Sequence, residues 1–406
     1  MKIALLHYSA PPVVGGVESI MGYHARLMAD GGHEVRVVAG RGESFDSRIP
    51  LVSVPLLDSC HPEILAAKAD LDAGRVPQVF SEITQKLVDQ LDTVLVGVDL
   101  LVAHNVCSLH KNLSLTAALR ELFNWGVFSR LFLWHHDLAW ATPRYRAELH
   151  DGFPWNLLRE DWPGAIQVVV SEQRRRELAE LIHVPLDRIV VVPNGIDVSR
   201  LLKLEPQTRE FVDRLDLLSA APLFLLPVRI TPRKNIELAL RVVDAMRNKF
   251  PQVQLVVTGP PGPHNPANQD YFLKLLAMRD ELHLNGVFHF LAEMTDEYLP
   301  EMVIADLYRL SDALFLPSRE EGFGIPILEA ALAGLPLFCS DIPSLRELAG
   351  DCGIYFSPDG NPIEIADLMA SHLRANPFLK LRARVRTNYT WERIYTERIS
   401  PLLRPG

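Results

Sequence analysis

The stretch DALFLPSREEGFGIPILEAALAGLPLFCSD, residues 312–341, decides the fold of this chain. Its apolar run at 313–316 has the length of a strand buried on both faces of a parallel sheet. A polar loop follows, and then an apolar helical pattern with Pro326 in its first turn and Gly334 just past its end. A second apolar run at 335–339 completes a strand, helix, strand unit with two parallel strands.

The loop of this unit is predicted to bind a ligand. In an open parallel sheet, ligands bind outside the carboxyl ends of the strands, which is where residues 318–325 would lie. Gly322 and Gly324 allow the backbone to approach a ligand closely, and amides at the start of a helix favour an anion or a hydroxyl-rich group. Glu321 in the loop and Glu329 on the helix are the carboxylates of interest.

Short apolar runs alternate with helical patterns along the whole chain, which predicts parallel sheets covered by helices on both faces. The expected strands lie at residues 3–7, 34–38, 51–54, 100–103, 131–134, 167–170, 190–192, 223–226, 254–257, 287–290, 313–316, 335–338 and 354–356. A polar stretch at 200–221 interrupts the series, which then restarts. We therefore predict an α/β protein with two doubly wound, Rossmann-like domains.

Composition excludes several classes of protein. The chain has 406 residues, of which 48% are hydrophobic and 22% charged, and this is enough apolar material for two cores. The net charge of −9 argues against a nucleic-acid partner, because such binding depends on neutralising phosphates. The basic clusters at 174–176 and 382–386 are interpreted as solvated helix faces rather than as membrane patches.

Cysteine spacing and hydropathy bear on the compartment. The four cysteines are scattered without metal-ligand spacing, so free thiols in a reducing environment are expected. No apolar stretch approaches the length of a signal-peptide core or a membrane span. We therefore expect a soluble cytoplasmic protein with no transmembrane segment. The sequence gives no signal for its oligomeric state.

The stretch at residues 312–341 resembles the signature of one enzyme family. It matches the E-x7-E motif of the retaining glycosyltransferases of family 4 at Glu321, Gly322, Phe323, Gly324, Pro326 and Glu329. The resemblance implies the GT-B fold, in which two Rossmann-like domains face a cleft. It implies that residues 1–203 form the acceptor domain, that residues 204–387 form the nucleotide-sugar domain, and that a helix within residues 388–406 crosses back to the first domain.

By the same resemblance, the helix-borne Glu329 accepts hydrogen bonds from the donor's ribose and the loop-borne Glu321 grips a hydroxyl of its sugar. The residues expected to line the donor site with them are Gly322, Phe323, Gly324 and Ile325. Leu291, just after the strand at 287–290, takes the place of the segment that reads the base through its backbone.

Arg229 and Lys234 flank a turn after the first strand of the second domain. These two cations lie at the carboxyl end of a strand and at the start of a helix, which suits the binding of a diphosphate. Arg can donate to two phosphate oxygens at once, while Lys acts as a point charge. The R-x4-K-N pattern also resembles family 4. Arg233 lies between the two residues and stays an alternative ligand. The proline-rich loop at 259–266 is a departure from the family, and its role stays open.

Polar residues of the first domain also stand at strand ends. Gly15 and Gly16 follow the first strand and resemble the family's GG-x-E loop, which faces the donor diphosphate. Four further residues are candidates for the site at strand ends, His104, Asn105, His136 and Asp137. His136 with Asp137 resembles the family's HD position, where the His meets the transferred sugar or its phosphate. His135 is the alternative to His136, and a zinc site built from His104, His135 and His136 is a disfavoured alternative.

The predicted reaction is glycosyl transfer with retention of anomeric configuration. The resemblance implies a UDP- or GDP-hexose donor and a small-molecule, glycan or lipid-linked acceptor. Arg229, Lys234, Glu321 and His136 are the catalytic candidates, and no metal or other cofactor is expected. The D-x-D at residues 70–72 is interpreted as solvated surface. Two alternatives stay open, a sugar-nucleotide 2-epimerase of similar architecture and a catalytically silent nucleotide-sugar-binding protein.

Overall fold

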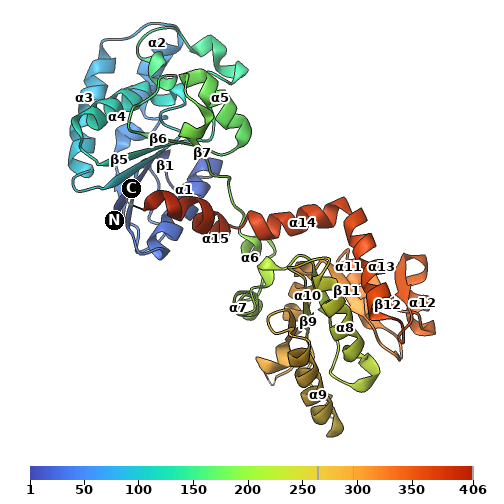
Figure 1. Cartoon of the computed structure of the whole chain (residues 1–406). Coiled ribbons are helices and arrows are strands. Elements are labelled where there is room, and N and C mark those ends of the chain that lie inside the picture. The colour runs from blue at the N-terminus through green and yellow to red at the C-terminus, as the bar shows by residue number, and fades with distance from the viewer. Residues whose placement is uncertain (263–264, 296, 405–406) are drawn as a thin grey trace. The chain divides into compact units, whose positions relative to one another are not determined.

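The structure is a computed structural model that describes residues 1–262, 265–295 and 297–404. The chain divides into two compact units, Met1–Gly195 with Trp391–Gly406, and Ile196–Thr390. Each unit holds one parallel sheet with helices packed on both faces (Figure 1). The prediction of two Rossmann-like domains is confirmed, and the first unit ends eight residues before position 203 and resumes three residues after position 388.

The first unit contains a seven-stranded sheet in the order β3-β2-β1-β4-β5-β6-β7. The strands are β1 Lys2–Ser9, β2 Glu34–Arg41, β3 Leu51–Ser53, β4 Leu100–His104, β5 Arg130–His135, β6 Ile166–Val169 and β7 Ile189–Val191. The helices are α1 Gly16–Asp30, α2 Pro62–Asp72, α3 Val79–Val94, α4 Leu113–Trp125 and α5 Glu172–Ile182. The strand order reverses between β1 and β4, so the carboxyl ends of these strands border a crevice suited to ligands.

β1 shows why this sequence forms a central strand. Ala4 and Leu6 pack into the core on one face of the sheet, whereas Ile3 and Leu5 pack into the core on the other face. Because successive side chains of a strand point to opposite faces, a continuous apolar run is what a strand covered on both faces requires.

The end of the chain returns to the first unit, as predicted. It forms α15 Trp391–Ile394, a π-helical turn Tyr395–Ile399 and α16 Ser400–Leu403. Ile394, Ile399 and Leu403 are buried in the same core as Ile3. Arg130 of β5 donates to the carbonyls of Leu402 and Leu403, so the segment lies beside the sheet and near the N-terminus (Figure 1).

The second unit contains a six-stranded sheet in the order β10-β9-β8-β11-β12-β13. The strands are β8 Leu223–Leu226, β9 Gln254–Val257, β10 Phe288–Phe290, β11 Ala313–Leu316, β12 Leu337–Ser340 and β13 Gly353–Phe356. The helices are α6 Val198–Leu201, α7 Pro206–Arg214, α8 Ile236–Arg247, α9 Ala267–Glu281, α10 Glu301–Leu310, α11 Ile325–Leu332, α12 Pro343–Ala349, α13 Pro362–Ala375 and α14 Pro377–Asn388. Here the order reverses between β8 and β11, which brings the loops after these two strands together.

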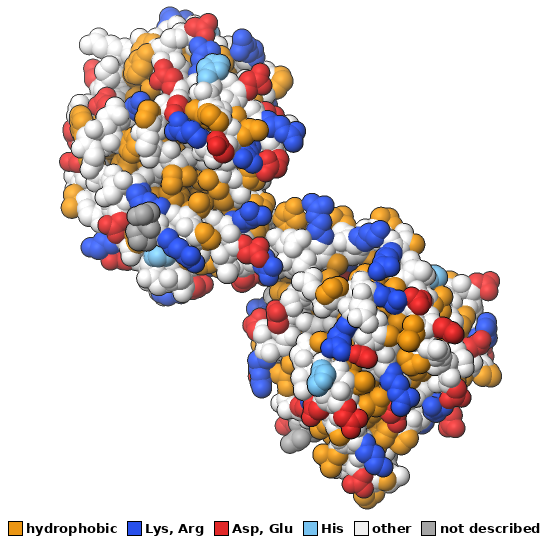
Figure 2. Space-filling view, in the orientation of Figure 1, with side chains coloured by type: hydrophobic (Ala, Val, Ile, Leu, Met, Phe, Trp, Pro, Cys, Tyr) orange, Lys and Arg blue, Asp and Glu red, His pale blue; other side chains and the backbone are white. Residues whose placement is uncertain are grey.

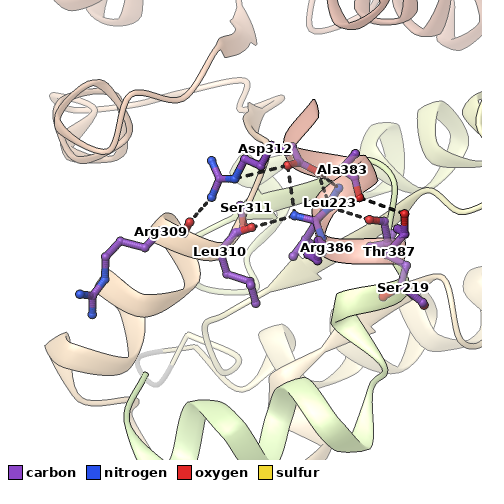
Figure 3. A network of polar contacts seen from close by, with 12 residues as sticks. Ser219, Leu223, Arg309, Leu310, Ser311, Asp312, Ala383, Arg386 and Thr387 are labelled. Atoms are coloured by element: carbon purple, nitrogen blue, oxygen red, sulfur yellow. Dashed lines mark hydrogen bonds and ion pairs between the residues drawn. The ribbon is translucent and has the colours of Figure 1, made fainter. Parts of the chain in front are cut away.

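A buried ion pair attaches α14 to the amino ends of the central strands β8 and β11 (Figure 3). The Arg386 guanidinium contacts both carboxylate oxygens of Asp312, at 3.1 and 2.6 Å, and donates to the carbonyls of Leu310 and Ala220. Asp312 also accepts from the backbone N–H of Leu223 at 2.8 Å. Arg386 is only 4% exposed, so its interpretation as part of a solvated face was wrong. A cation on a helix looks the same in the sequence whether its partner is water or a buried carboxylate.

Among the residues that the structure describes, no helix combines the length and hydrophobicity needed to cross a bilayer.

Arg386→Met should destabilise the second unit by about 3–5 kcal/mol, because it leaves the Asp312 carboxylate buried without its main partner. Denaturant unfolding measures the loss. Arg384→Met is the matched control, since Arg384 is exposed on the same helix and should change stability by no more than about 0.5 kcal/mol. Equal effects of the two substitutions would contradict a stabilising role for the ion pair.

Candidate functional site

The loops after β8 and β11 bring Lys234 and Glu321 together. Lys234 ends a short 3₁₀ turn, Pro232–Lys234, and its Nζ lies 2.6 and 2.7 Å from the two carboxylate oxygens of Glu321. Ser318 donates to Glu321 Oε1 at 2.7 Å. Both side chains are largely buried, 10% exposed for Lys234 and 6% for Glu321. Their contact follows from the sheet order, which makes β8 and β11 neighbours.

Asn235 holds these loops in place. Its backbone is left-handed, with φ of 54°, which lets the chain turn sharply between the 3₁₀ turn and α8. Its side-chain amide donates to the carbonyls of Pro317 and Pro358, at 3.1 and 2.8 Å. Arg319 adds a backbone bond to Arg233 O at 2.8 Å. One buried side chain thus ties the Lys234 loop to the loops after β11 and β13.

Burial lowers the pKa of the Lys234 ammonium, while its hydrogen bonds to Glu321 act in the opposite direction. The Arg233 guanidinium lies 3.9 Å from Glu321 Oε2 and is half exposed. A buried charge interacts strongly with its neighbours, because little water screens it. An incoming anion at this place would compete with Glu321 for Lys234.

Arg229 is exposed on the loop after β8, and its guanidinium lies over the Tyr298 ring, 5.3 Å from the centroid. The proline-rich loop runs beside it, since Ile230 N donates to Pro260 O at 3.0 Å. A Cβ on Gly259 would lie 2.4 Å from Val228 O, so this close approach requires glycine. Of the loop predicted at 259–266, residues 263 and 264 lie outside the described residues.

Gly322 and Gly324 differ in why they are glycine. Gly324 has φ of +106°, and a Cβ there would lie 2.7 Å from Leu345 Cδ2, so backbone and packing both exclude a larger residue. A Cβ on Gly322 would meet no protein atom within 4 Å. Phe323 and Ile325 are 56% and 58% exposed. The loop therefore presents open backbone and two apolar side chains to solvent, an arrangement suited to a ligand.

Glu329 lies on the exposed face of α11 and accepts a hydrogen bond from Tyr308 Oη at 2.6 Å. Tyr308 comes from α10 and is buried, and burial together with this bond raises the pKa of its phenol. The phenol therefore remains a donor that orients the carboxylate. Leu291 has a fully buried side chain, so only its backbone is available to a ligand.

In the first unit, Asn105 shapes the turn that carries His136 and Asp137. It follows β4 in a left-handed conformation, with φ of 60°. Its Oδ1 accepts from the backbone N–H groups of His136 and Asp137, at 2.8 and 3.0 Å. It is 3% exposed and its polar atoms are occupied by the protein. Asn105 therefore positions the candidate residues, and its direct contact with substrate stays a prediction.

Buried histidines surround this turn. His104 Nδ1 lies 3.3 Å from His136 Nε2, and His24 packs against His104 with a centroid distance of 5.4 Å. His135 instead contacts Gln167 Oε1 at 2.8 Å, so His104, His135 and His136 do not form one ligand set for zinc. Burial lowers the pKa of His24 and of His136 to about 3 each, so these rings are neutral at pH 7. His104 is completely buried beside His136, and its contact with substrate stays a prediction.

The carboxylate of Glu18 packs against the glycine loop after β1. Ser9 Oγ donates to Glu18 Oε1 at 2.6 Å, and His7 Nε2 lies 3.8 Å from the same oxygen. A Cβ on Gly15 would lie 2.0 Å from Glu18 Oε2, so Gly15 makes room for this carboxylate. Gly16 is exposed, and a Cβ there would meet no protein atom within 4 Å.

The structure describes one group of His, Cys, Asp and Glu side chains close enough to share a metal ion, Asp72, His110 and Glu148. Lys68 Nζ already lies 2.5 Å from Asp72 and 3.1 Å from Glu148. His110 Nε2 lies 2.6 Å from the same Glu148 oxygen. The ammonium neutralises the carboxylates, so this group is explained by structure alone. Asp70 pairs with Arg75 at 2.7 Å, which agrees with a surface role for the D-x-D.

Sequence reasoning missed several residues of these sites. Ser318 precedes Glu321 by three positions and could have been found from its place in the same loop. Ser9 and Glu18 flank the glycine pair and were equally visible. Tyr308 and His24 gave no signal, because their contacts to Glu329 and His104 depend on how helices pack.

Two family models match the chain. The model described as "Glycosyltransferase Family 4" matches residues 14–200, which include all of the first unit's candidate residues, from Gly15 to Asp137. The model described as "Glycosyl transferases group 1" matches residues 209–390, which include Lys234 and Glu321.

The chain is also similar to individual proteins, at low sequence identity. A serotype-specific mannosyltransferase, WbdA of Escherichia coli, is 33% identical over 152 residues, 37% of this chain and 17% of the relative. The chain thus aligns with about a sixth of that relative's length. The mannosylglucosylglycerate synthase of Thermotoga maritima is 26% identical over 364 residues, 83% of this chain and 80% of the relative. The chain also aligns with the crystal structure of WaaG, a glycosyltransferase involved in lipopolysaccharide biosynthesis. That alignment covers 100% of each chain, at 17% sequence identity and a TM-score of 0.38.

His24→Phe should make the first unit less sensitive to acid. An unfolded histidine has a pKa near 6.5, whereas burial lowers that of His24 to about 3. Between these values the unfolded chain binds more protons, so stability falls as the pH falls below about 6.5. At about pH 5.5 the variant should lose about 1 kcal/mol less than the native chain, relative to neutral pH. Thermal unfolding at both pH values measures this.

The control is His372→Phe, which replaces an exposed histidine of the second unit and should leave the acid sensitivity unchanged. An identical pH response of native chain and His24→Phe would contradict a lowered pKa of His24 in the folded chain.

Proposed function

Because the chain belongs to the family 4 glycosyltransferases, we propose that it transfers a hexosyl group from a nucleoside diphosphate sugar to a hydroxyl group of an acceptor. The observation that carries the proposal is the buried Lys234–Glu321 pair, with contacts of 2.6 and 2.7 Å at the carboxyl ends of β8 and β11. It offers a cation for a diphosphate and a carboxylate for a sugar hydroxyl in one place.

In the proposed reaction, the bond between the anomeric carbon and the diphosphate oxygen breaks, and the acceptor oxygen bonds to that carbon. The acceptor's proton passes to an oxygen of the departing phosphate. Negative charge therefore grows on the diphosphate, where Lys234 and Arg229 would stabilise it. Retention of configuration by attack on the same face is part of the proposal and rests on the family.

The two glutamates divide the donor between them in this proposal. Glu321, released from Lys234 when the phosphates bind, accepts hydrogen bonds from the sugar. Glu329, oriented by Tyr308, accepts them from the ribose. Gly322 and Gly16 have open space where a side chain would stand, which supports close approach of a ligand to both loops. The base is proposed to pair with backbone near Leu291.

The first unit is proposed to bind the acceptor. His136 would contact the transferred sugar through a neutral imidazole, and Asp137 would lie beside it. Asn105 fixes both through their backbone N–H groups. Arg174 lies 3.7 Å from Asp137 and further restrains its carboxylate.

Mannose is the first hexose to test, because the names of the relatives from Escherichia coli and Thermotoga maritima both specify mannosyl products or transfer. The nucleotide is proposed to be GDP or UDP. A cytoplasmic location is proposed because the four cysteines are free thiols.

A screen of nucleotide sugars against glycan, lipid-linked and small-molecule acceptors, read by product mass, tests the proposal. The expected product is the acceptor plus one hexose. An isomerised donor without an acceptor product would indicate the 2-epimerase. Tight nucleotide-sugar binding without turnover would indicate the silent binding protein.

Lys234→Ala should lower kcat/KM by about 10²–10³-fold, because the leaving diphosphate loses its buried cation. Steady-state kinetics with the donor found in the screen measures the change. Arg241→Ala is the control, since Arg241 is exposed on α8 and should leave the kinetics unchanged. A native-like rate for Lys234→Ala, with the protein folded, would remove Lys234 from the mechanism.

Turnover should persist in EDTA, because the proposal assigns charge stabilisation to Lys234 and Arg229. The measurement is the initial rate before and after chelation. Loss of activity that a divalent cation restores would contradict this part of the proposal.

A further inference from the structure

The helix α14 has an outward face that the core does not explain. Its inner face carries Leu379 and Arg386, which are 6% and 4% exposed. About a third of a turn around the helix, Phe378 and Leu381 are 66% and 55% exposed, and Val385 is partly exposed. These three residues are spaced i, i+3 and i+7, so they form one apolar stripe. Single exposed hydrophobic residues are ordinary on protein surfaces, but a stripe in helical register is not.

Cations border this stripe on both sides. At 3.6 residues per turn, Lys380 and Arg384 lie along one edge and Arg382 along the other. Arg382 contributes less than the other two cations, because it donates to the carbonyl of Arg309, its Nε lies 3.8 Å from Asp312 Oδ1, and its side chain is 23% exposed. Arg384 donates to Tyr389 Oη at 3.1 Å, which leaves its charge uncompensated. We call the three apolar residues and these three cations the outer face of α14.

The sequence around this helix contains no acidic residues. Residues 368–391 contain no Asp or Glu, although the whole chain has a net charge of −9. Figure 2 shows hydrophobic and basic side chains gathered over α14 in the second unit. The basic character is thus local, and it coincides with the apolar stripe.

A hollow lies beside the start of the helix, on the side of Leu379. It has a volume of about 580 Å³, and its lining includes Phe338, Ile354, Leu373 and Leu379. Asp351 also lines it and is its one carboxylate among the lining residues. The hollow lies where β12 and β13 begin, whereas Lys234 and Glu321 lie at the opposite edge of the sheet. It is therefore separate from the candidate donor site.

We propose that the outer face of α14 binds the surface of an anionic lipid bilayer, which replaces the sequence-based interpretation of residues 382–386 as a solvated face. In such binding, apolar side chains enter the boundary between headgroups and acyl chains, while Lys and Arg meet the phosphates. The stripe with its flanking cations supplies both kinds of contact. A second copy of this chain fits less well, because a symmetric contact would set the same cations against one another. This surface is independent of the proposed transfer reaction.

The test is sedimentation of the full chain with vesicles of phosphatidylcholine mixed with phosphatidylglycerol, and with vesicles of phosphatidylcholine alone. Binding should occur with the anionic vesicles at low salt, weaken at high salt, and be absent with the neutral vesicles. No binding to either vesicle, or equal binding to both, would overturn the proposal.

Two double variants locate the binding. Phe378→Ser with Leu381→Ser removes the stripe, and Lys380→Glu with Arg384→Gln removes the cations along one edge. Each pair should weaken binding to anionic vesicles by about tenfold or more, since each cation contributes about fivefold. Ile363→Ser, at an exposed position on α13, is the control and should bind as the native chain does.

Thermal unfolding checks that the variants are folded, and light scattering reports their oligomeric state. Undiminished vesicle binding by both double variants would overturn the proposal. So would a stripe variant that changes the oligomeric state of the chain without affecting vesicle binding. Transfer to a water-soluble acceptor should be the same for all these variants, so failure of this proposal and failure of the proposed reaction are distinguishable.

Discussion

The ammonium of Lys234 is buried, and a buried charge requires an opposite charge close to it. Glu321 meets this requirement with two contacts, and Ser318 fixes the carboxylate from its other side. The loops must hold their shape for the pair to persist, which is the role of Asn235. The fold of the second unit near the reversal of its strand order is thus organised around one charge pair.

The candidate residues of the two units differ in charge although they lie at equivalent places in the two sheets. Each has its candidate residues at the carboxyl ends of strands next to the reversal of strand order. In the second unit these residues are charged and paired. In the first unit, burial keeps the imidazole of His136 neutral and Asn105 directs the backbone, while Asp137 is the one carboxylate among the candidates. Under the proposed function, the charged pair would bind the diphosphate of the donor and the first unit would bind the hydroxyl-bearing acceptor.

The strands and the helix after Glu321 could be predicted because their signals are local. A short apolar run predicts a buried strand, and proline and glycine mark the ends of α11, Ile325–Leu332. The Lys234–Glu321 contact could not be predicted, because it depends on β8 lying beside β11, and the two residues had been assigned separate roles. The same limit applies to Tyr308 beside Glu329 and to the buried Arg386. Sequence identifies which side chains carry chemistry, while packing decides which of them meet.

Asn235 illustrates how narrowly a single position can be specified. Glycine would accept the left-handed backbone at this position but would release the carbonyls of Pro317 and Pro358. Aspartate would accept the backbone too, but it would set a carboxylate against those two carbonyl oxygens. Alanine would lack the amide and strain the turn. None of these three replacements satisfies backbone and side chain together, so this residue, which lies outside the expected ligand set, has little freedom to vary.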